Sequence, residues 1–192
     1  KTNDDYIIAS DTDSVYINMA PLVKMTGATD KDKIVKALDT FCQERLEPYI
    51  AQVYGELGNY MNVRENKMVM KREAIADRGI WTAKKRYILN VHNSEGVQYP
   101  EPKLKIMGIE AVKTSTPLPC REKLRESFKI LMSGDEKQMK DFVVKFRREF
   151  EHMSPEQIGF PRSINNIEKY SDTTSIYKKG TPMHVKGALL YN

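Results

Sequence analysis

Two acidic residues, Asp11 and Asp13, have the types and the spacing that could do chemistry in this chain. They lie between residues 6–8 and 15–17, two runs of β-branched and aromatic side chains that are typical of strands. The pair is therefore expected at or near the turn of a hairpin. Alternate residues of a strand point to the same side, so the two carboxylates can converge while Thr12 faces away.

Converging carboxylates predict a site for a divalent cation. Two like charges held close together repel strongly in partly buried surroundings, and a cation between them keeps both ionised. Oxygen ligands of this kind suit Mg²⁺. The alternative interpretation is structural, because Asp and Ser are common turn residues in any case. The motif alone leaves both interpretations open.

Positive charge is concentrated in one segment of the chain. The 192 residues carry a net charge of +5, and between Arg64 and Lys105 there are ten Lys and Arg against five Asp and Glu. This segment therefore accounts for the whole net charge. A localised basic stretch is what a phosphate-contacting surface needs. A solvated strand face would give the same charge run, so composition does not decide between the two.

Several classes of protein are disfavoured by composition. Cys42 and Cys120 are the only cysteines and lie far apart, which argues against a disulfide scaffold or a zinc ribbon. His92, His152 and His184 do not have the spacing of metal ligands. No apolar run approaches the roughly 20 residues needed to cross a bilayer, and the start of the chain has no signal-peptide pattern. No membrane partner is expected.

One helix is predicted after the hairpin. Thr29 and Asp30 offer a helix cap, and apolar residues follow at helical spacing. The helix should run to about Tyr54, with Gly55 and Gly58 near its end. Its apolar face is expected to pack against a sheet.

The basic segment reads as strands. Residues 67–91 alternate, with a turn predicted near Asp77-Arg78-Gly79. A second turn is predicted at 93–96, and residues 97–109 form another extended stretch. If Lys84 to Tyr87 lie in a strand, Lys85 and Tyr87 share one face while Lys84 and Arg86 share the other.

The remainder of the chain reads as helical. Amphipathic helices are predicted at 121–132 and 135–152, joined by Ser133-Gly134, with short helices at 165–170 and 182–191. Strands and one helix followed by a mostly helical half predict an α+β fold. We place the boundary near Gly108.

Five segments resemble the family B DNA polymerases of T-even-like bacteriophages, in order and in approximate spacing. They are an Asp-Thr-Asp-Ser hairpin, a palm strand, a Lys-Lys-Arg-Tyr block, a Lys-Ile-Met-Gly segment and a thumb helix, at residues 6–17, 70–76, 84–87, 101–110 and 184–192. The resemblance covers the whole chain. It implies that residues 1–108 are the C-terminal part of a polymerase palm, an antiparallel sheet with a packed helix, and that 109–192 are the N-terminal part of a mainly helical thumb.

The resemblance assigns roles in metal binding. Asp13 would bridge two Mg²⁺ ions, with Mn²⁺ as an alternative, and Asp11 would be a lesser ligand or electrostatic partner. Glu73 matches a palm acid near the metals in phage relatives, although a surface glutamate on a strand is the competing interpretation. Lys71 departs from the pattern, because close relatives can carry an aspartate there, and this puts an auxiliary metal role of the strand in doubt.

The resemblance also implies contacts with DNA. Lys85 and Tyr87 would hold the primer end, and Lys103 and Lys105, which share a face, could follow the duplex upstream; ordinary solvated lysines are the alternative for the last two. Contacts with phosphates position the duplex without reading its sequence. The full set of expected DNA-binding residues is Lys84, Lys85, Arg86, Tyr87, Lys103, Lys105 and Lys186.

A second catalytic aspartate motif and a triphosphate-binding finger helix, both expected of this family, are not visible in the 192 residues. The chain opens on Lys1 almost directly before a strand, which suggests a piece of a longer protein. We therefore expect a polymerase fragment that is inactive alone. Its expected partners are primer-template DNA, deoxynucleoside triphosphates, the exonuclease, fingers and N-terminal palm domains, and a sliding clamp bound through a segment outside this chain, all in the cytoplasm of an infected bacterium.

Two alternatives remain at this point. One is a non-catalytic DNA-binding scaffold that keeps a polymerase-like fold. The other is an RNA-copying or primer-making enzyme with a similar carboxylate hairpin. The second is disfavoured, because the Lys-Lys-Arg-Tyr block and the thumb helix follow the order of the DNA polymerases.

Overall fold

The computed structural model describes residues 5–191 and divides the chain into two compact units. The first unit extends to Ile109 and includes Phe128–Gly134, and the second contains Glu110–Ser127 and the residues from Asp135 onward. Antiparallel sheets and a packed helix make up the first, whereas the second is mainly helical. The predicted α+β class is confirmed.

The first two strands form the predicted hairpin. Strands β1 (Ile7–Asp11) and β2 (Ser14–Ile17) are antiparallel, and Asp11 pairs with Ser14. The register leaves only Thr12 and Asp13 in the turn, and Thr12 has a positive φ of 48°. Asp13 thus lies in the two-residue hairpin turn, and Asp11 ends the strand before it.

A helical segment follows that is longer than predicted. Its parts are α1 (Ala20–Thr26), which the sequence did not indicate, and then α2 (Lys31–Phe41), the π-helical η1 (Cys42–Leu46) and α3 (Glu47–Tyr60). Asp30 caps α2 as expected, because its carboxylate accepts hydrogen bonds from the backbone N–H groups of Asp32 and Lys33.

The predicted end near Tyr54 is wrong, since α3 continues through Gly55 and Gly58 to Tyr60. A glycine inside a helix costs only about 1 kcal/mol, which the rest of a long helix can offset. The helix ends where Asn62 adopts a positive φ of 54°.

The π-helical turn η1 lies just before a proline. Pro48 has no N–H, so the carbonyl of Glu44 cannot receive the usual helical hydrogen bond from it. One residue earlier, the N–H of Glu47 bonds to the carbonyl of Cys42, five residues back, in place of the carbonyl of Gln43. The helix therefore passes from α2 to α3 without a break but with one wide turn.

The larger sheet has the order β3-β4-β5, with both pairs antiparallel. Its strands are β3 (Ala74–Ala83), β4 (Arg86–Ser94) and β5 (Val97–Met107). The turn predicted near Asp77-Arg78-Gly79 is wrong, because β3 runs through these residues with irregular register around Ala76 and Arg78. The chain reverses instead at Lys84-Lys85, while the second predicted turn, at Glu95-Gly96, is confirmed.

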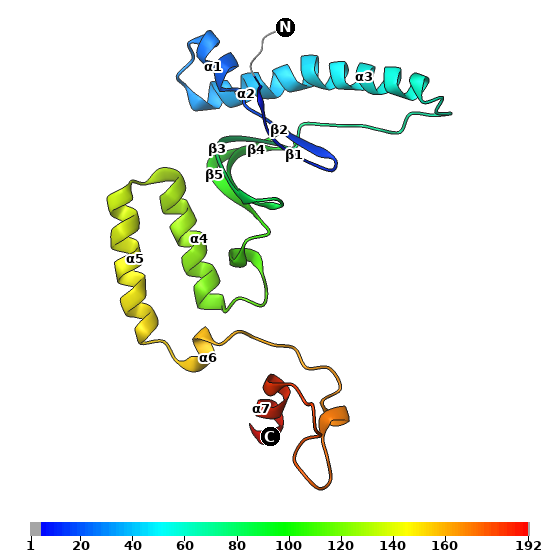
Figure 1. Ribbon diagram of the computed structural model, residues 1–192. Helices are drawn as coiled ribbons and strands as arrows, with labels where there is room; N and C mark the ends of the chain where they lie inside the picture. The colour runs from blue at the N-terminus through cyan, green and yellow to red at the C-terminus, as the bar shows by residue number, and fades with distance from the viewer. Residues whose placement is uncertain (1–4, 192) are drawn as a thin grey trace. The chain divides into compact units, whose positions relative to one another are not determined.

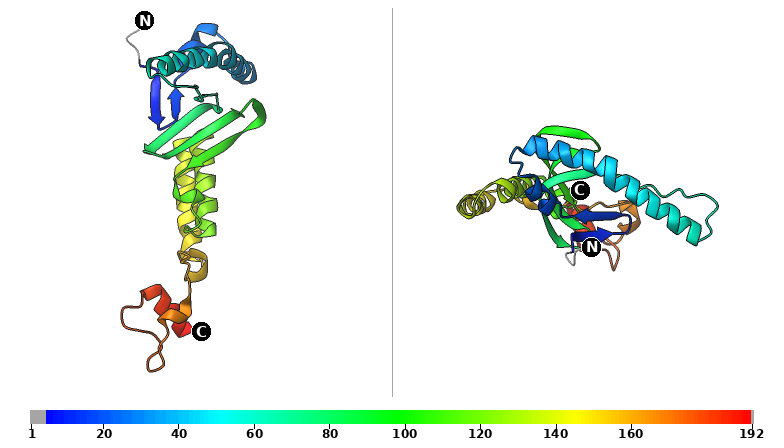
Figure 2. Two further views of the ribbon diagram at one scale, coloured as in Figure 1. Left: turned by 90° about the vertical axis from the view of Figure 1, so that its right-hand side faces the viewer. Right: turned by 90° about the horizontal axis from the view of Figure 1, so that it is seen from above.

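The core of the first unit lies on one face of this sheet. Ile88 of the central strand packs with Ile109 and Met132, and Phe128 is packed against the same cluster. Arg78 donates a hydrogen bond of 2.7 Å to the carbonyl of Met132, which satisfies a free carbonyl at a helix C-terminus. Figures 1 and 2 show the hairpin β1–β2 between the sheet and the helix α2–η1–α3.

The second unit is built from helices at nearly the predicted positions. Lys123 joins α4 to α5 through an ion pair of 2.8 Å with Glu149, and its ammonium lies 5.9 Å from the ring centre of Phe142. The N-terminus of α5 is closed by a capping box between Asp135 and Gln138. The elements after β5 are η2 (Glu110–Val112), α4 (Leu118–Ser133), of which Phe128–Ser133 belongs to the first unit, α5 (Glu136–Glu151), α6 (Pro155–Ile158), which was not predicted, η3 (Ile167–Tyr170) and α7 (Met183–Tyr191). Within residues 5–191, no helix combines the length and apolar character needed to span a bilayer.

Candidate active site

The two aspartates differ in their surroundings. Asp11 ends β1 and its side chain is 29% exposed, whereas Asp13 lies in the turn and is exposed. The strand-alternation argument for their convergence is therefore wrong, because Asp13 is not in a strand. Both carboxylates nevertheless lie at the same tip. Among residues 5–191, no group of three or more acidic, His or Cys side chains could hold a metal ion.

Hydroxyl groups of the turn organise Asp11. Thr12 Oγ1 donates a hydrogen bond of 3.2 Å to Asp11 Oδ1, and Ser14 Oγ donates one of 3.1 Å to the Asp11 carbonyl. These bonds orient one carboxylate and close the turn beneath it. They leave Asp13 at the solvent-accessible side of the tip.

The structure brings the basic block to the acidic hairpin. Lys84 and Lys85 form the turn between β3 and β4, so the predicted alternation of Lys85 with Tyr87 is wrong; only Arg86 and Tyr87 belong to the strand. Lys85 Nζ lies 3.8 Å from Asp11 Oδ2, with 67% of the lysine side chain exposed. An ion pair this open contributes at most about 1 kcal/mol. Its importance is positional, because it joins two motifs far apart in sequence.

Three aromatic rings hold the hairpin against the sheet. The ring of Tyr16 in β2 makes edge contacts with Trp81 at 5.3 Å and Tyr87 at 5.4 Å between ring centres. Burial and a side-chain hydrogen bond with Tyr16 raise the pKa of Tyr87 well above its usual value. Gly79 makes room for the indole, since a Cβ there would lie 2.7 Å from the Trp81 ring. The cluster fixes where the Asp11–Asp13 tip lies relative to the Lys84-Lys85 turn.

A cavity of about 790 Å³ lies between the hairpin, the long helix and the sheet. Its lining includes the polar side chains of Asp13, Lys71, Arg72, Glu73 and Lys105. Asp11 is not among the lining residues. The cavity therefore places Asp13 and Glu73, two of the three predicted metal ligands, on the wall of one space.

Glu73 lies immediately before β3 and forms an ion pair with Lys105 of β5. Its carbonyl accepts a hydrogen bond of 2.8 Å from the N–H of Glu95. Lys105 thus has a carboxylate partner in this structure. The Glu73 side chain is 60% exposed, and the residue also lines the cavity that Asp13 lines.

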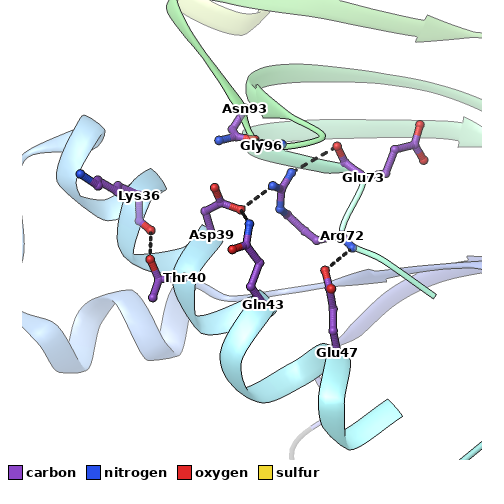
Figure 3. A network of polar contacts seen from close by, with 9 residues as sticks. All are labelled: Lys36, Asp39, Thr40, Gln43, Glu47, Arg72, Glu73, Asn93 and Gly96. Carbon is purple, nitrogen blue, oxygen red and sulfur yellow. Dashed lines mark hydrogen bonds and ion pairs between the residues drawn. The ribbon is translucent and has the colours of Figure 1, made fainter. Parts of the chain in front are cut away.

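Arg72 anchors the segment that carries Glu73 (Figure 3). The Arg72 side chain is 9% exposed, and its guanidinium pairs with Asp39, whose side chain is 18% exposed. Glu47 accepts a hydrogen bond of 2.9 Å from the Arg72 N–H, and Gln43 donates one of 3.1 Å to Asp39. Because Asp39 lies in α2 and Glu47 in α3, Arg72 ties both of these helices to the segment before β3.

The sequence analysis gave Arg72 no role. The available signal was the spacing of Asp39, Gln43 and Glu47, four residues apart, which places three polar side chains along one side of a helix. The basic residue that they meet could not be identified, since its position depends on how the helix packs.

Asp77 forms a second link between the long helix and the sheet. Its carboxylate lies 3.2 Å from Lys31 Nζ, accepts a hydrogen bond of 2.7 Å from Asn90 Nδ2, and lies 3.2 Å from His92 Nε2. Burial raises the pKa of Asp77, but the hydrogen bonds from Asn90 and Lys31 and the charges of His92 and Lys31 outweigh it, so the pKa is lower than usual.

We expect Asp77→Asn to destabilise the protein at neutral pH by about 1 kcal/mol. A carboxyl group with a lowered pKa stabilises the fold above its unfolded pKa of about 3.8 and loses this contribution as the pH falls through the folded value. The difference in the free energy of unfolding between wild type and variant should therefore shrink below pH 4. Urea unfolding at pH 7 and pH 3 measures it, and a difference that stays constant would contradict the prediction.

The other predicted DNA-binding residues lie in different places. Lys84 is exposed in the turn, and Lys103 lies on β5 with its ammonium 4.1 Å from the ring centre of Tyr99. Lys103 and Lys105 are two residues apart in the strand and share a face, as predicted. Lys186 belongs to α7 in the second unit, where its ammonium lies 4.9 Å from the Tyr177 ring centre.

Comparison with known proteins identifies the class of protein to which this chain is similar. No protein-family model matches the chain. Nearly all of it is, however, similar to a segment of DNA-directed DNA polymerases of bacteriophages, as the resemblance predicted.

Two such polymerases can be named. The chain is 36% identical over 202 residues to the DNA-directed DNA polymerase of Enterobacteria phage T4, which covers 99% of the chain. It is 37% identical over 198 residues to that of Escherichia phage RB69, which covers 97%. In both cases the chain spans 22% of the length of the relative.

Proposed function

We propose that this chain is part of a family B, DNA-directed DNA polymerase that replicates phage DNA in the cytoplasm of an infected bacterium. Similarity to the polymerases of T4 and RB69 over at least 97% of the chain carries the proposal. The contact between Lys85 and Asp11 supports it, because it places the basic block beside the acidic hairpin. In this proposal residues 1–108 are the C-terminal part of the palm and 109–192 the N-terminal part of the thumb.

Asp13, Asp11 and Glu73 are the proposed metal ligands. All three offer carboxylate oxygens, the ligands that suit Mg²⁺, although residues 5–191 do not by themselves gather three such groups around one point. Two bound ions would lower the pKa of the attacking hydroxyl and stabilise charge on the attacking and leaving oxygens during in-line transfer. Asp13 would hold both ions, with Asp11 beside it and Glu73 at the cavity wall. A further carboxylate must come from the rest of the polymerase.

The basic residues are proposed to position the primer. The Lys85 ammonium, on a turn beside the acidic tip, would contact the terminal backbone phosphates of the primer, and Tyr87 would support it from the aromatic cluster. Lys84, Arg86, Lys103 and Lys105 are proposed to follow the duplex. Lys186 is proposed to act from the thumb.

Primer extension by the whole polymerase tests the proposal. The enzyme that contains this chain should extend a primed template with deoxynucleoside triphosphates and Mg²⁺, while the 192-residue chain alone should not. Binding of primed DNA by the whole protein without any extension would contradict the proposal and favour the non-catalytic scaffold. Partners such as a sliding clamp and the exonuclease and finger domains belong to the same proposal.

Lys85→Ala tests the proposed primer contact. Loss of one phosphate contact should weaken primer-template binding roughly fivefold near 0.15 M salt and flatten the slope of log K against log salt by about 0.9. Lys33→Ala is the matched control, because Lys33 is an exposed lysine of α2 outside the basic segment. Fluorescence anisotropy across a salt series measures both quantities. An unchanged slope for Lys85→Ala would contradict a phosphate contact at this position.

A further inference from the structure

Gly108 follows β5 in the left-handed region, with a φ of +66°. It belongs to the 101–110 segment, to which the proposed function gives no role at this position. A Cβ placed on Gly108 would lie 2.2 Å from the carbonyl oxygen of Lys85 and 3.3 Å from its carbonyl carbon. Both are backbone atoms, so no side-chain rotation can relieve the overlap.

The contact is made at the turn that carries the basic block. Only Lys84 and Lys85 separate Ala83 from Arg86 in the paired register, and Lys85 itself has a positive φ of 61°. Lysine rarely adopts this conformation, because a positive φ is strained for a residue with a side chain. Contacts with neighbouring residues must therefore hold the turn in place. The bare backbone of Gly108 is packed directly against the peptide that follows Lys85.

We propose that Gly108 is a positioning residue for the Lys84-Lys85 turn. The absence of a side chain at position 108 lets the end of β5 pass against the Lys85 carbonyl, and this contact sets where the Lys85 ammonium lies beside the Asp11–Asp13 tip. A side chain at 108 moves the turn and withdraws the ammonium from the primer. The inference rests on the proposed function, since it assigns Gly108 to the primer contact of Lys85.

Gly108→Ala in the whole polymerase is the central variant, and Gly27→Ala is its matched control. Gly27 has nearly the same left-handed φ, +64°, but a Cβ there would meet nothing within 4 Å. The two variants therefore share the backbone strain of alanine at positive φ, and only Gly108→Ala adds the overlap with Lys85. Any difference between the two variants in DNA affinity or salt slope therefore reports the overlap with Lys85.

We expect Gly108→Ala to reproduce the signature of Lys85→Ala. Affinity for primed DNA should fall roughly fivefold near 0.15 M salt, and the salt slope should flatten by about 0.9, as for one lost phosphate contact. Gly27→Ala should keep the wild-type slope. In the Gly108→Ala/Lys85→Ala double variant, the losses of DNA affinity caused by the two substitutions should not add, because both remove the same contact. General destabilisation would not change a salt slope.

The result that overturns the inference is a Gly108→Ala enzyme with the slope of Gly27→Ala, or losses that add with Lys85→Ala. These outcomes differ from failure of the proposed function, in which the wild-type polymerase itself does not extend primers. If Gly108→Ala does not fold, Lys85→Gly in the same chain should restore folding by freeing the turn, without restoring DNA affinity. Failure of that rescue would also overturn the inference.

Discussion

Asp13→Ala should abolish primer extension by the whole polymerase, with a loss on the order of a thousandfold or more. The proposed role of this carboxylate is to hold both ions, so its removal takes away the charge stabilisation of the transfer step. Affinity for primed DNA should change little, because no phosphate contact is lost. Single-turnover extension and equilibrium binding measure the two quantities separately.

Asp13→Asn and Glu65→Ala serve as controls for this result. Asparagine keeps the size and turn preference of aspartate, so Asp13→Asn should be as inactive as Asp13→Ala if charge is what matters. Glu65 is an exposed carboxylate whose only described ion pair, with Lys67, is 3.5 Å long and open to solvent, so Glu65→Ala should retain full activity. An Asp13→Asn enzyme with a tenth of wild-type activity would remove Asp13 from the proposed metal site.

Arg72→Met should destabilise the fold by about 3 kcal/mol. The substitution leaves Asp39, which is largely buried, without its cationic partner, and it also removes the 3.4 Å hydrogen bond from the guanidinium to the Glu73 carbonyl. Methionine fills a similar space to arginine, so the loss of stability reflects the missing charge and hydrogen bonds more than a change in packing. Urea unfolding gives the change in the free energy of unfolding.

A second substitution separates the effect of the unpaired buried charge from the other effects of losing Arg72. Asp39→Leu combined with Arg72→Met should recover much of the lost stability, because no unpaired charge remains. Lys31→Met is the exposed counterpart: the Lys31 side chain is 70% exposed, so losing its pair with Asp77 should cost less than about 1 kcal/mol. Equal losses for Arg72→Met and Lys31→Met would refute the argument from burial.

Elements with clear local signals were predictable from the sequence. The hairpin around Thr12 followed from its flanking β-branched residues, and the Glu95-Gly96 turn and the two helices joined by Ser133-Gly134 followed from turn and cap residues. The Lys84-Lys85 turn was not predictable, because neither lysine favours a turn. Lys85 has a positive φ in this turn, and its carbonyl lies close to Gly108, which is distant in sequence.

The opposite error occurred in β3. Asp77-Arg78-Gly79 has the composition of a turn, yet the strand continues because each polar group finds a partner in the fold. Asp77 bonds to Asn90 on the neighbouring strand, and Arg78 bonds to the end of α4. Tertiary contacts of this kind override local propensity.

The candidate site, like the fold, was only partly predictable from the sequence. Residue types located the Asp11–Asp13 pair, but the strand geometry used to explain it was incorrect, since Asp13 belongs to the turn. The approach of Lys85 to Asp11 needed the packed sheet and hairpin. Arg72 was overlooked because a buried arginine cannot be recognised before the helix carrying its partners has been placed.

The wide turn at Cys42–Leu46 has a consequence for engineering the long helix. Successive residues of a regular α-helix are rotated by about 100°, and the wide turn takes up one extra residue without changing the faces of the helix beyond it. Deleting one residue from this turn would therefore restore regular winding and leave Tyr49, Val53 and Leu57 facing solvent. Deleting one residue within Glu47–Tyr60 would instead rotate the part of α3 beyond the deletion by that angle.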